Sequence, residues 1–280
     1  MNLNTVKIVV DSSADLTHLD TVPFQSVPLR IITAEGEYPD DAALNVEDMV
    51  DHLAHYKGRS STACPSPEDW LNAFGEAEQV FCITITGSLS GSYNAACTAS
   101  ELYREAHPER QVFVFDSLTA GPEIALMVEH LREKILSGAS FDGARASLAA
   151  YAAKTGVVFM LESMKNLANN GRVSPLVARM AGLLGIRVVG KAGDHGTLEP
   201  IHKCRGEARA LESLCSLLKE LGWKQGRIRI AHCFNEEAAL RLREMIRAEC
   251  AKPRVEISRC RGLCSFYAER GGLLVGFEKA

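Results

Sequence analysis

Hydroxyl-bearing side chains are concentrated in three short polar segments, each ahead of a stretch of helix-forming residues. The segments are Asp11 to Ser13, Ser61 to Pro65, and Thr86 to Ser92. Serine and threonine oxygens accept hydrogen bonds from free helix N–H groups, so capping alone would explain any one segment. Three such segments at one sheet edge combine hydroxyl donors with helix N-termini, which attract anions. The sequence therefore predicts a site for a phosphate or a carboxylate.

Ser90 could also act as a nucleophile, and His232 could act as a base. Ser90 lies in Leu-Ser-Gly-Ser-Tyr, which does not match the GxSxG nucleophile elbow of hydrolases. A lone histidine at the end of an expected strand, such as His232, is more often a structural hydrogen-bonding group. A hydrolase or phosphotransferase acting through Ser90 or His232 stays an alternative. The sequence has no GxGxxG and no GxxxxGK[ST] motif, so nucleotide binding has no motif support.

Two arginines in the second half of the chain could meet an anion, although each could equally be a surface residue. Arg172 follows a turn at Asn170 and Gly171, and Arg205 follows an expected strand. The paired acids are interpreted as turn and helix-start residues; they are Asp40 with Asp41, and Glu236 with Glu237.

Cys260 and Cys264 form the one close pair among nine cysteines. No CxxC accompanies them and no histidine follows, so we expect packing rather than zinc binding. An odd number of scattered cysteines favours reduced thiols in a cytoplasm.

Apolar β-branched runs that end in polar residues indicate a parallel sheet. Such runs occupy Val6–Val10, Val80–Ile85 and Gln111–Phe115, and each precedes a helix-forming stretch. Strands that alternate with helices are typical of a parallel sheet, whose ligands bind at the carboxyl ends of the strands. We expect this N-terminal α/β domain to cover residues 1–157.

The pattern changes after about residue 155, where a second, α+β domain of residues 158–280 is predicted. A hairpin is expected around Gly193–Gly196, and helices are expected at Arg205–Trp223 and Asn235–Cys250. The expected strands that complete its sheet are Arg227–Ala231, Arg254–Ile257 and Leu273–Phe277.

Composition excludes several classes of protein. The 280 residues are 46% hydrophobic and carry a net charge of −4 with 6% aromatics, which argues against a nucleic-acid ligand. The N-terminus does not resemble a secretory signal, and the apolar runs are too short to cross a bilayer as helices. We expect a cytoplasmic protein without an integral membrane segment.

A series of motifs in fixed order resembles the DegV family of bacterial fatty-acid-binding proteins over nearly the whole chain. The matching segments are KIVVDSSADL at 7–16, VPLRIITAEGEYPDD at 27–41, STACPSPEDW at 61–70, GSLSGSYNAA at 87–96, VFDSLTAGPE at 114–123, LESMKNLANNGRVS at 161–174, IHKCRGEARAL at 201–211 and AHCFNEEAA at 231–239.

The resemblance implies a long-chain fatty acid in a tunnel between a Rossmann-like, three-layer parallel-sheet domain and a C-terminal α+β domain. By position, Thr62 and Ser90 would bind its carboxylate. Arg172 and Arg205 match basic residues that would face a phosphate or a partner. The expected supporting residues of the cleft are Ser12, Ser13, Gly91, Ser92 and His232.

Three departures from the family pattern affect phosphate handling more than carboxylate binding. Ala63 and Cys64 replace a Ser-Gln pair, and Glu207 stands where a basic residue is common. Tyr267 occupies the place of a histidine, and a phenol donates a hydrogen bond without positive charge near neutral pH.

The resemblance implies carriage of the fatty acid, without metal or other cofactor, and phosphorylation by a separate fatty acid kinase. A regulatory protein whose cleft ligand is merely structural stays a further alternative.

Overall fold

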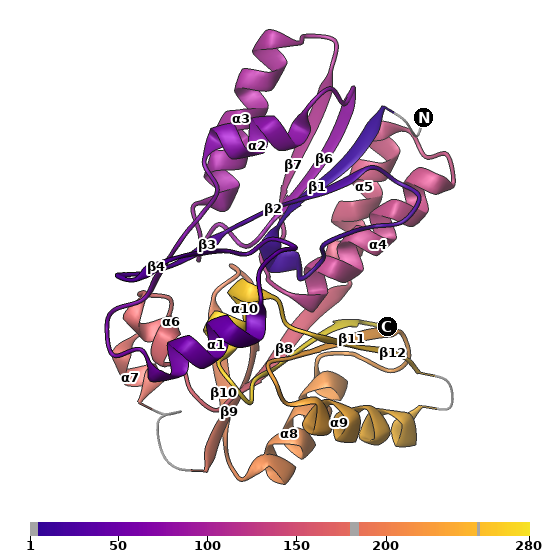
Figure 1. The fold of residues 1–280 in the computed structure, drawn as a ribbon. Coiled ribbons are helices and arrows are strands. Elements are labelled where there is room, and N and C mark those ends of the chain that lie inside the picture. Colours follow the sequence, from indigo (N-terminus) through magenta and orange to yellow (C-terminus); the bar gives the residue numbers. More distant parts are fainter. Residues whose placement is uncertain (1–4, 180–184, 251–252) are drawn as a thin grey trace.

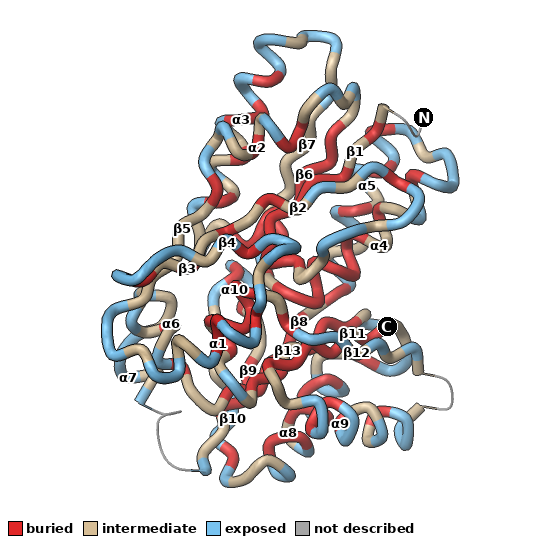
Figure 2. The backbone as a smooth tube through the Cα atoms, viewed as in Figure 1, coloured by how far each residue is buried: buried red, intermediate tan, exposed pale blue. Residues whose placement is uncertain are grey.

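The computed structural model describes residues 5–179, 185–250 and 253–280, and it has two halves stacked along the long axis of the molecule (Figure 1). The first half is built around a parallel sheet and the second around a mixed sheet. Figure 2 shows that buried residues follow the strands of both halves and the helix α4 between them.

The first sheet has four parallel strands in the order β2–β1–β6–β7. Their bounds are Phe24–Val27 (β2), Val6–Asp11 (β1), Gln79–Thr84 (β6) and Gln111–Asp116 (β7). Branched and aromatic side chains favour strands because they pack well on a pleated surface. The parallel sheet predicted from the three apolar runs is confirmed.

Helices cover both faces of this sheet, so the first half has the three predicted layers. Val6, Ile8 and Val10 of β1 pack with α4 and α5, whereas Val9 packs with α2 and α3, because successive strand residues point to opposite faces. The helices span Pro67–Phe74 (α2), Ser92–Ala106 (α3), Pro122–Leu136 (α4) and Phe141–Ala152 (α5).

The second sheet has six strands in the order β10–β9–β8–β13–β11–β12, in which β11 and β12 are parallel and the other pairs antiparallel. The strands span Thr155–Leu161 (β8), Ile186–Ala192 (β9), Leu198–Arg205 (β10), Arg227–His232 (β11), Arg254–Arg259 (β12) and Leu273–Glu278 (β13). Helices α8 (Glu207–Glu220) and α9 (Glu236–Glu249) bury one face of this sheet. The predicted hairpin, helices and strands of this half are confirmed.

A small antiparallel sheet, β4–β3–β5, bridges the two halves. Its strands span Arg30–Thr33 (β3), Gly36–Pro39 (β4) and Ser61–Ala63 (β5). Ile31 of β3 and Met49 of helix α1 (Val46–His55) are fully buried in a cluster with Phe159 and Phe266 of the second half. The segment between β2 and α2 thus packs against the second sheet.

Short helices complete the structure between the two halves. They are η1 (Ser12–Ala14), α6 (Lys165–Asn169), α7 (Pro175–Ala178) and α10 (Gly262–Ala268). Gly276 of β13 lets α4 approach closely, since a Cβ there would lie 2.6 Å from the Glu123 nitrogen.

Ser61 to Ala63 differ from the sequence-based expectation. We expected a polar loop at the edge of the parallel sheet, but these residues form β5, which pairs with β3. Helix α10 was not expected at all. The expected domain division after residue 157 falls within β8 and stays a prediction.

Candidate functional site

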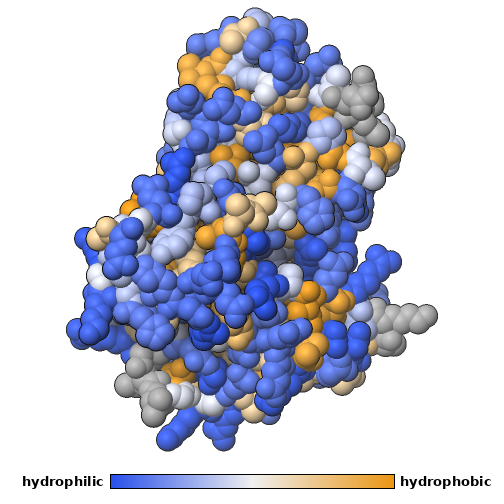
Figure 3. Space-filling model, in the orientation of Figure 1, coloured by the Kyte–Doolittle hydropathy of each residue, from blue (hydrophilic) through white to orange (hydrophobic). Residues whose placement is uncertain are grey.

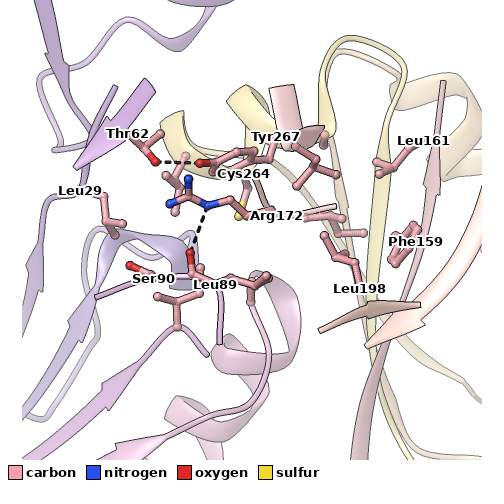
Figure 4. Close-up of a pocket in the computed structure, with 16 residues that line it drawn as sticks. Leu29, Thr62, Leu89, Ser90, Phe159, Leu161, Arg172, Leu198, Cys264 and Tyr267 are labelled. Atoms are coloured by element: carbon pink, nitrogen blue, oxygen red, sulfur yellow. Dashed lines mark hydrogen bonds between the residues drawn. The ribbon is translucent and has the colours of Figure 1, made fainter. Parts of the chain in front are cut away.

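A mainly apolar cavity lies between the two halves, beside the small sheet. Its volume is about 100 Å³. Figure 4 shows Thr62, Ser90, Arg172 and Tyr267 around it, and Leu161, Phe159 and Leu198 on the side of the second sheet. The remaining lining is Leu29, Ile85, Leu89, Ala120, Leu167, Leu263, Cys264, Ala268 and Leu274. We call this space the head cavity; it offers polar groups from four residues against a hydrocarbon-like lining.

Thr62 and Tyr267 form the first polar contact of the head cavity. Their hydroxyl oxygens lie 2.7 Å apart, and either can be the donor (Figure 4). Thr62 is held by β5, where it pairs with Ile31 of β3. Burial raises the pKa of the Tyr267 phenol, against smaller lowering effects from Thr62 and Arg172, so the phenol is neutral near pH 7.

Asp40, which directly follows β4 of the small sheet, holds the helix that carries Tyr267. The Asp40 carboxylate accepts hydrogen bonds from the backbone nitrogens of Gly262 (2.7 Å) and Leu263 (2.8 Å) at the start of α10. An acidic group satisfies free N–H groups at a helix N-terminus and complements their partial positive charge. A Cβ at Gly262 would lie 2.7 Å from Asp40 Oδ1, so this close cap depends on glycine.

Asp11 fixes the loop that carries Ser90. Its buried carboxylate accepts hydrogen bonds from the Ile85 nitrogen (2.9 Å), the Ser92 hydroxyl (2.6 Å) and the hydroxyl of Ser13. Burial raises the pKa of Asp11, although these hydrogen bonds act in the opposite direction. Ser90 itself accepts a hydrogen bond from the Ser92 nitrogen at 3.2 Å.

Arg172 supplies the cation of the head cavity. Its Nε donates to the Leu89 carbonyl at 3.1 Å and its Nη1 donates to the Asn170 carbonyl at 2.6 Å. The guanidinium carbon lies 5.7 Å from the centre of the Tyr267 ring, within the range of a cation–π contact. Gly171 precedes Arg172 with a φ of +74°, a conformation that favours glycine.

The structure places the expected supporting residues behind the cavity rather than on its wall. Ser12 accepts a hydrogen bond from the Leu29 nitrogen at 3.1 Å. The hydroxyls of Ser13 and Ser92 donate hydrogen bonds to the Asp11 carboxylate. A Cβ at Gly91 would lie 3.0 Å from Cys64 Sγ, so Gly91 allows two site segments to meet.

His232 and Arg205 are not among the residues that line the head cavity. His232 is buried at the end of β11, where its Nδ1 accepts a hydrogen bond from the Asn235 nitrogen at 3.3 Å. Burial lowers the pKa of His232. Arg205 is exposed at the end of β10.

The arrangement is suited to binding an amphipathic anion. Among the described residues, the cavity lining includes no histidine or carboxylate that could serve Ser90 as a base. The described part of the chain also holds no group of three or more His, Cys, Asp or Glu side chains placed to bind a metal ion. Hydroxyl donors and a guanidinium at one end, with leucines and Phe159 beyond them, match a carboxylate with a hydrocarbon chain.

Two acids essential to this geometry were missed from the sequence. Asp40 was interpreted as a turn residue, but its partners lie 222 and 223 positions further along the chain. Asp11 was seen merely as part of a polar segment. The sequence did hold one signal for Asp11. It directly follows the apolar strand residues Val9 and Val10, so its carboxylate could be expected to be buried.

On the face shown in Figure 3, hydrophilic side chains dominate and apolar ones occur in scattered groups. Within residues 5–179, 185–250 and 253–280, no helix has both the length and the apolar character needed to cross a membrane.

Comparison with known proteins assigns the chain to a family. Residues 5–279 match the DegV family model, whose description is that of an uncharacterised protein family. The DegV domain-containing protein spr0652 of Streptococcus pneumoniae is 42% identical over 278 residues, which cover 98% of this chain and 99% of that protein.

Two solved structures are similar over the whole fold. A DegV family protein from Eubacterium eligens, loaded with heptadecanoic acid, is 42% identical with a TM-score of 0.96, over 98% of this chain and 100% of that one. The Streptococcus pneumoniae Fatty Acid Kinase (Fak) B3 protein, loaded with linoleic acid, is 42% identical with a TM-score of 0.97, over 99% of this chain and 100% of that one.

Proposed function

The chain belongs to the DegV family, and on that premise we propose that it binds one long-chain fatty acid between its two halves. The carboxylate meets Thr62, Ser90 and Tyr267, and the hydrocarbon chain lies among the apolar side chains. The observation that carries this proposal is the head cavity itself, which is apolar except for the groups gathered at one end. The fatty acids bound by the two similar structures support the same assignment.

Burial of the chain supplies the affinity, and the polar groups supply the orientation. Each methylene removed from water contributes about 0.8 kcal/mol, so partial burial of a long chain is enough for tight binding. A hydrogen bond to a charged group contributes about 1.5–3 kcal/mol, which favours the carboxylate at the polar end. Binding of this kind requires no catalytic base, metal or other cofactor.

We infer that the bound acid is presented to a separate fatty acid kinase, so this chain is a binding protein rather than an enzyme. The Fak B3 protein of Streptococcus pneumoniae supports this role by similarity. Arg172 and Tyr267 lie at the polar end, where a phosphoryl group would be added, and exposed Arg205 is a candidate contact for the partner. We propose a cytoplasmic location, because all nine cysteines are free thiols.

The direct test is native mass spectrometry of the protein before and after extraction with organic solvent, followed by calorimetry on the delipidated protein. We expect a co-purifying fatty acid in a one-to-one ratio and renewed binding of long-chain acids. An alkane of equal length should bind more weakly because it leaves the hydroxyl donors unpaired. Absence of long-chain acid binding in properly folded, delipidated protein would disprove the proposed function.

The second test concerns phosphorylation. Tyr267 is neutral where the family pattern has a histidine, so Arg172 is left as the cation of the head cavity beside a developing acyl phosphate. We expect ordinary fatty-acid affinity but slow phosphorylation by a fatty acid kinase from a related bacterium, with a gain for Tyr267→His. Tyr267→Phe is the matched control, since it removes the hydroxyl of the ring without adding a charge. Rapid phosphorylation that none of these changes affects would show either that Tyr267 lies outside the phosphoryl site or that Arg172 and Arg205 suffice for the positive charge.

A further inference from the structure

A second space, which we call the middle cavity, adjoins the head cavity. Its volume is about 60 Å³. The two cavities share five lining residues, so they are neighbours along one wall; these are Leu89, Ala120, Phe159, Leu198 and Leu274. The hairpin between β9 and β10 closes the middle cavity, since Gly196 lines it and the Ser88 hydroxyl donates to the His195 carbonyl at 2.6 Å.

A third space, the far cavity, adjoins the middle cavity on its other side. It has a volume of about 480 Å³ and lies between the two halves, beside the end of α5 and the start of β8. Val157 and Ala192 line both the middle and the far cavity. The side chains of Val157 and Ala192 therefore form the boundary between the small middle cavity and the larger far cavity.

Strand β8 connects all three cavities through alternate residues on one face. Leu161 lines the head cavity, Phe159 the head and middle cavities, Val157 the middle and far cavities, and Thr155 the far cavity. A strand rises about 3.3 Å per residue, so Leu161 and Thr155 are about 20 Å apart. The three cavities thus lie in series along β8, over a distance comparable to the length of an extended acyl chain.

The head and middle cavities are too small to enclose a long chain by themselves. An apolar cavity of about 150 Å³ holds one benzene molecule. The head and middle cavities, at about 100 Å³ and 60 Å³, offer comparable space together. A long acyl chain needs several times this space, and the adjoining far cavity adds about 480 Å³.

The far cavity differs from the other two in its chemistry. Glu123, which is 5% exposed, accepts a hydrogen bond there from the Thr155 hydroxyl at 2.8 Å. Burial raises the pKa of Glu123, against smaller effects of Thr119, Thr155 and Lys279. The charged residues Asp116, Asp194, Lys191 and Lys279 also line this cavity.

We propose that the acyl tunnel opens past Val157 and Ala192 into the far cavity, so that this protein accepts long-chain acids bearing a polar group, such as a hydroxyl, on the terminal carbon. This inference rests on the proposed fatty-acid binding and adds a class of ligand to it. A short acid ends in the apolar part of the tunnel, whereas a long acid ends among polar groups. The terminal hydroxyl is thus unfavourable in short acids and tolerated in long ones.

The test compares two pairs of ligands by calorimetry on delipidated protein: decanoic and hexadecanoic acid, each with its ω-hydroxy counterpart. An unpaired buried hydroxyl weakens binding by roughly five- to a hundred-fold. We expect a penalty in that range for the ten-carbon pair and less than a threefold penalty for the sixteen-carbon pair. Equal penalties at the two lengths overturn the inference, even when hexadecanoic acid binds well and the proposed function holds.

A blocking variant locates the opening. Ala192→Leu places a larger side chain at the boundary and should raise the ω-hydroxy penalty of the sixteen-carbon pair at least fivefold. Ala146→Leu, the same change at an exposed position of α5, is the matched control. It should leave the ω-hydroxy penalties of the ten-carbon and sixteen-carbon pairs as they are in the unmodified protein. Val157→Phe serves as a second blocking variant where Ala192→Leu lowers stability. Penalties unchanged in a folded blocking variant place the opening elsewhere and overturn the inference.

Discussion

Thr62 lies in β5 of the small sheet and Ser90 in the loop between β6 and α3, yet both contribute a hydroxyl group to the head cavity. We predict that Thr62→Val and Ser90→Ala each weaken binding of a long-chain acid by about 1.5–3 kcal/mol, because each removes one hydrogen bond to the carboxylate. Calorimetry on delipidated variants measures the effect. Thr98→Val, at an exposed position of α3, is the control. Unchanged affinity in the Thr62→Val/Ser90→Ala double variant would mean that the carboxylate points elsewhere.

Asp15 predicts a pH dependence of stability. Its Oδ2 is buried without a hydrogen-bond partner among the described residues, while the Arg261 nitrogen donates to Oδ1 at 2.9 Å. Burial, together with the nearby Asp40, raises the Asp15 pKa from 3.8 to about 7, although contacts with Arg261 and Cys264 oppose the rise. The folded state thus holds this proton more tightly than the unfolded state. The resulting stability is fully present below pH 4 and is lost as the pH rises to about 7.

Asp15→Asn should remove this contribution, since asparagine is neutral at every pH and tolerates the left-handed conformation at this position (φ 56°). Between pH 4 and 7, the unfolding free energy of the unmodified protein should fall relative to the variant by up to about 1.4 kcal/mol per pH unit. Urea unfolding at several pH values gives the difference. Asp20→Asn, at an exposed position, is the control. Parallel pH profiles for Asp15→Asn and the unmodified protein would contradict the assignment.

The sequence identified the residues that line the site better than those that support it. The clustering of hydroxyls pointed to the polar segments that contain Thr62 and Ser90, and the family pattern singled out these two residues and Tyr267 by position. Asp40 left no local signal, because the amides that it caps belong to a helix at the other end of the chain. Ser12, Ser13 and Ser92 carried the same signal as Ser90, but Ser12 accepts from the Leu29 nitrogen, and Ser13 and Ser92 donate to the Asp11 carboxylate, so none of them lines the cavity.

Helix α10 depends on Asp40 and carries both Tyr267 and Cys264 to the head cavity. Asp40→Ala leaves the buried amides of Gly262 and Leu263 without their acceptors, and each unpaired group costs about 1–3 kcal/mol. We predict a loss of roughly 2–4 kcal/mol in the free energy of unfolding. Hydrogen exchange should also become faster in residues 262–268, and fatty-acid affinity should fall because Tyr267 is less well placed.

Asp41→Ala is the matched control, because Asp41 is exposed and its carboxylate accepts a hydrogen bond from the nearby Ala43 nitrogen. Its effect on unfolding should stay below about 1 kcal/mol. Equal losses for Asp40→Ala and Asp41→Ala, or unchanged exchange in residues 262–268, would contradict a capping role for Asp40.

Elements with a strong period were predictable, and short ones were not. The strands β1, β6 and β7 follow from apolar runs, and α8 and α9 from amphipathic patterns. Strand β5 has three residues, which is too short for an alternation to be recognised. Helix α10 has seven residues, of which six are buried, so it has no polar face to reveal a helical period.

The ligand path joins all three sheets, so ligand binding should stabilise the molecule as a whole. Thr62 belongs to the small sheet, Ser90 follows the parallel sheet, and Phe159 belongs to the mixed sheet. Arg227 of β11 adds a contact between the halves independent of the ligand, because it pairs with Glu133 of α4 at 2.9 Å. Glu278 of β13, in the same sheet as Arg227, pairs with it at 2.8 Å and so holds it in place. A bound acyl chain would thus add to the apolar packing and the ion pair that already join the halves.

We predict that the thermal midpoint of delipidated protein rises with the concentration of added fatty acid. A ligand that binds the folded state alone stabilises it by about 2.7 kcal/mol at a hundred times its Kd, which corresponds to roughly 5–10 °C in a chain of this size. Calorimetric scans over a concentration series, below the point where the acid forms micelles, measure this shift. The Thr62→Val/Ser90→Ala double variant should need a higher acid concentration for the same shift, because it removes hydrogen bonds to the carboxylate. A midpoint that does not depend on acid concentration would show that the acid does not bind the folded state in preference to the unfolded chain.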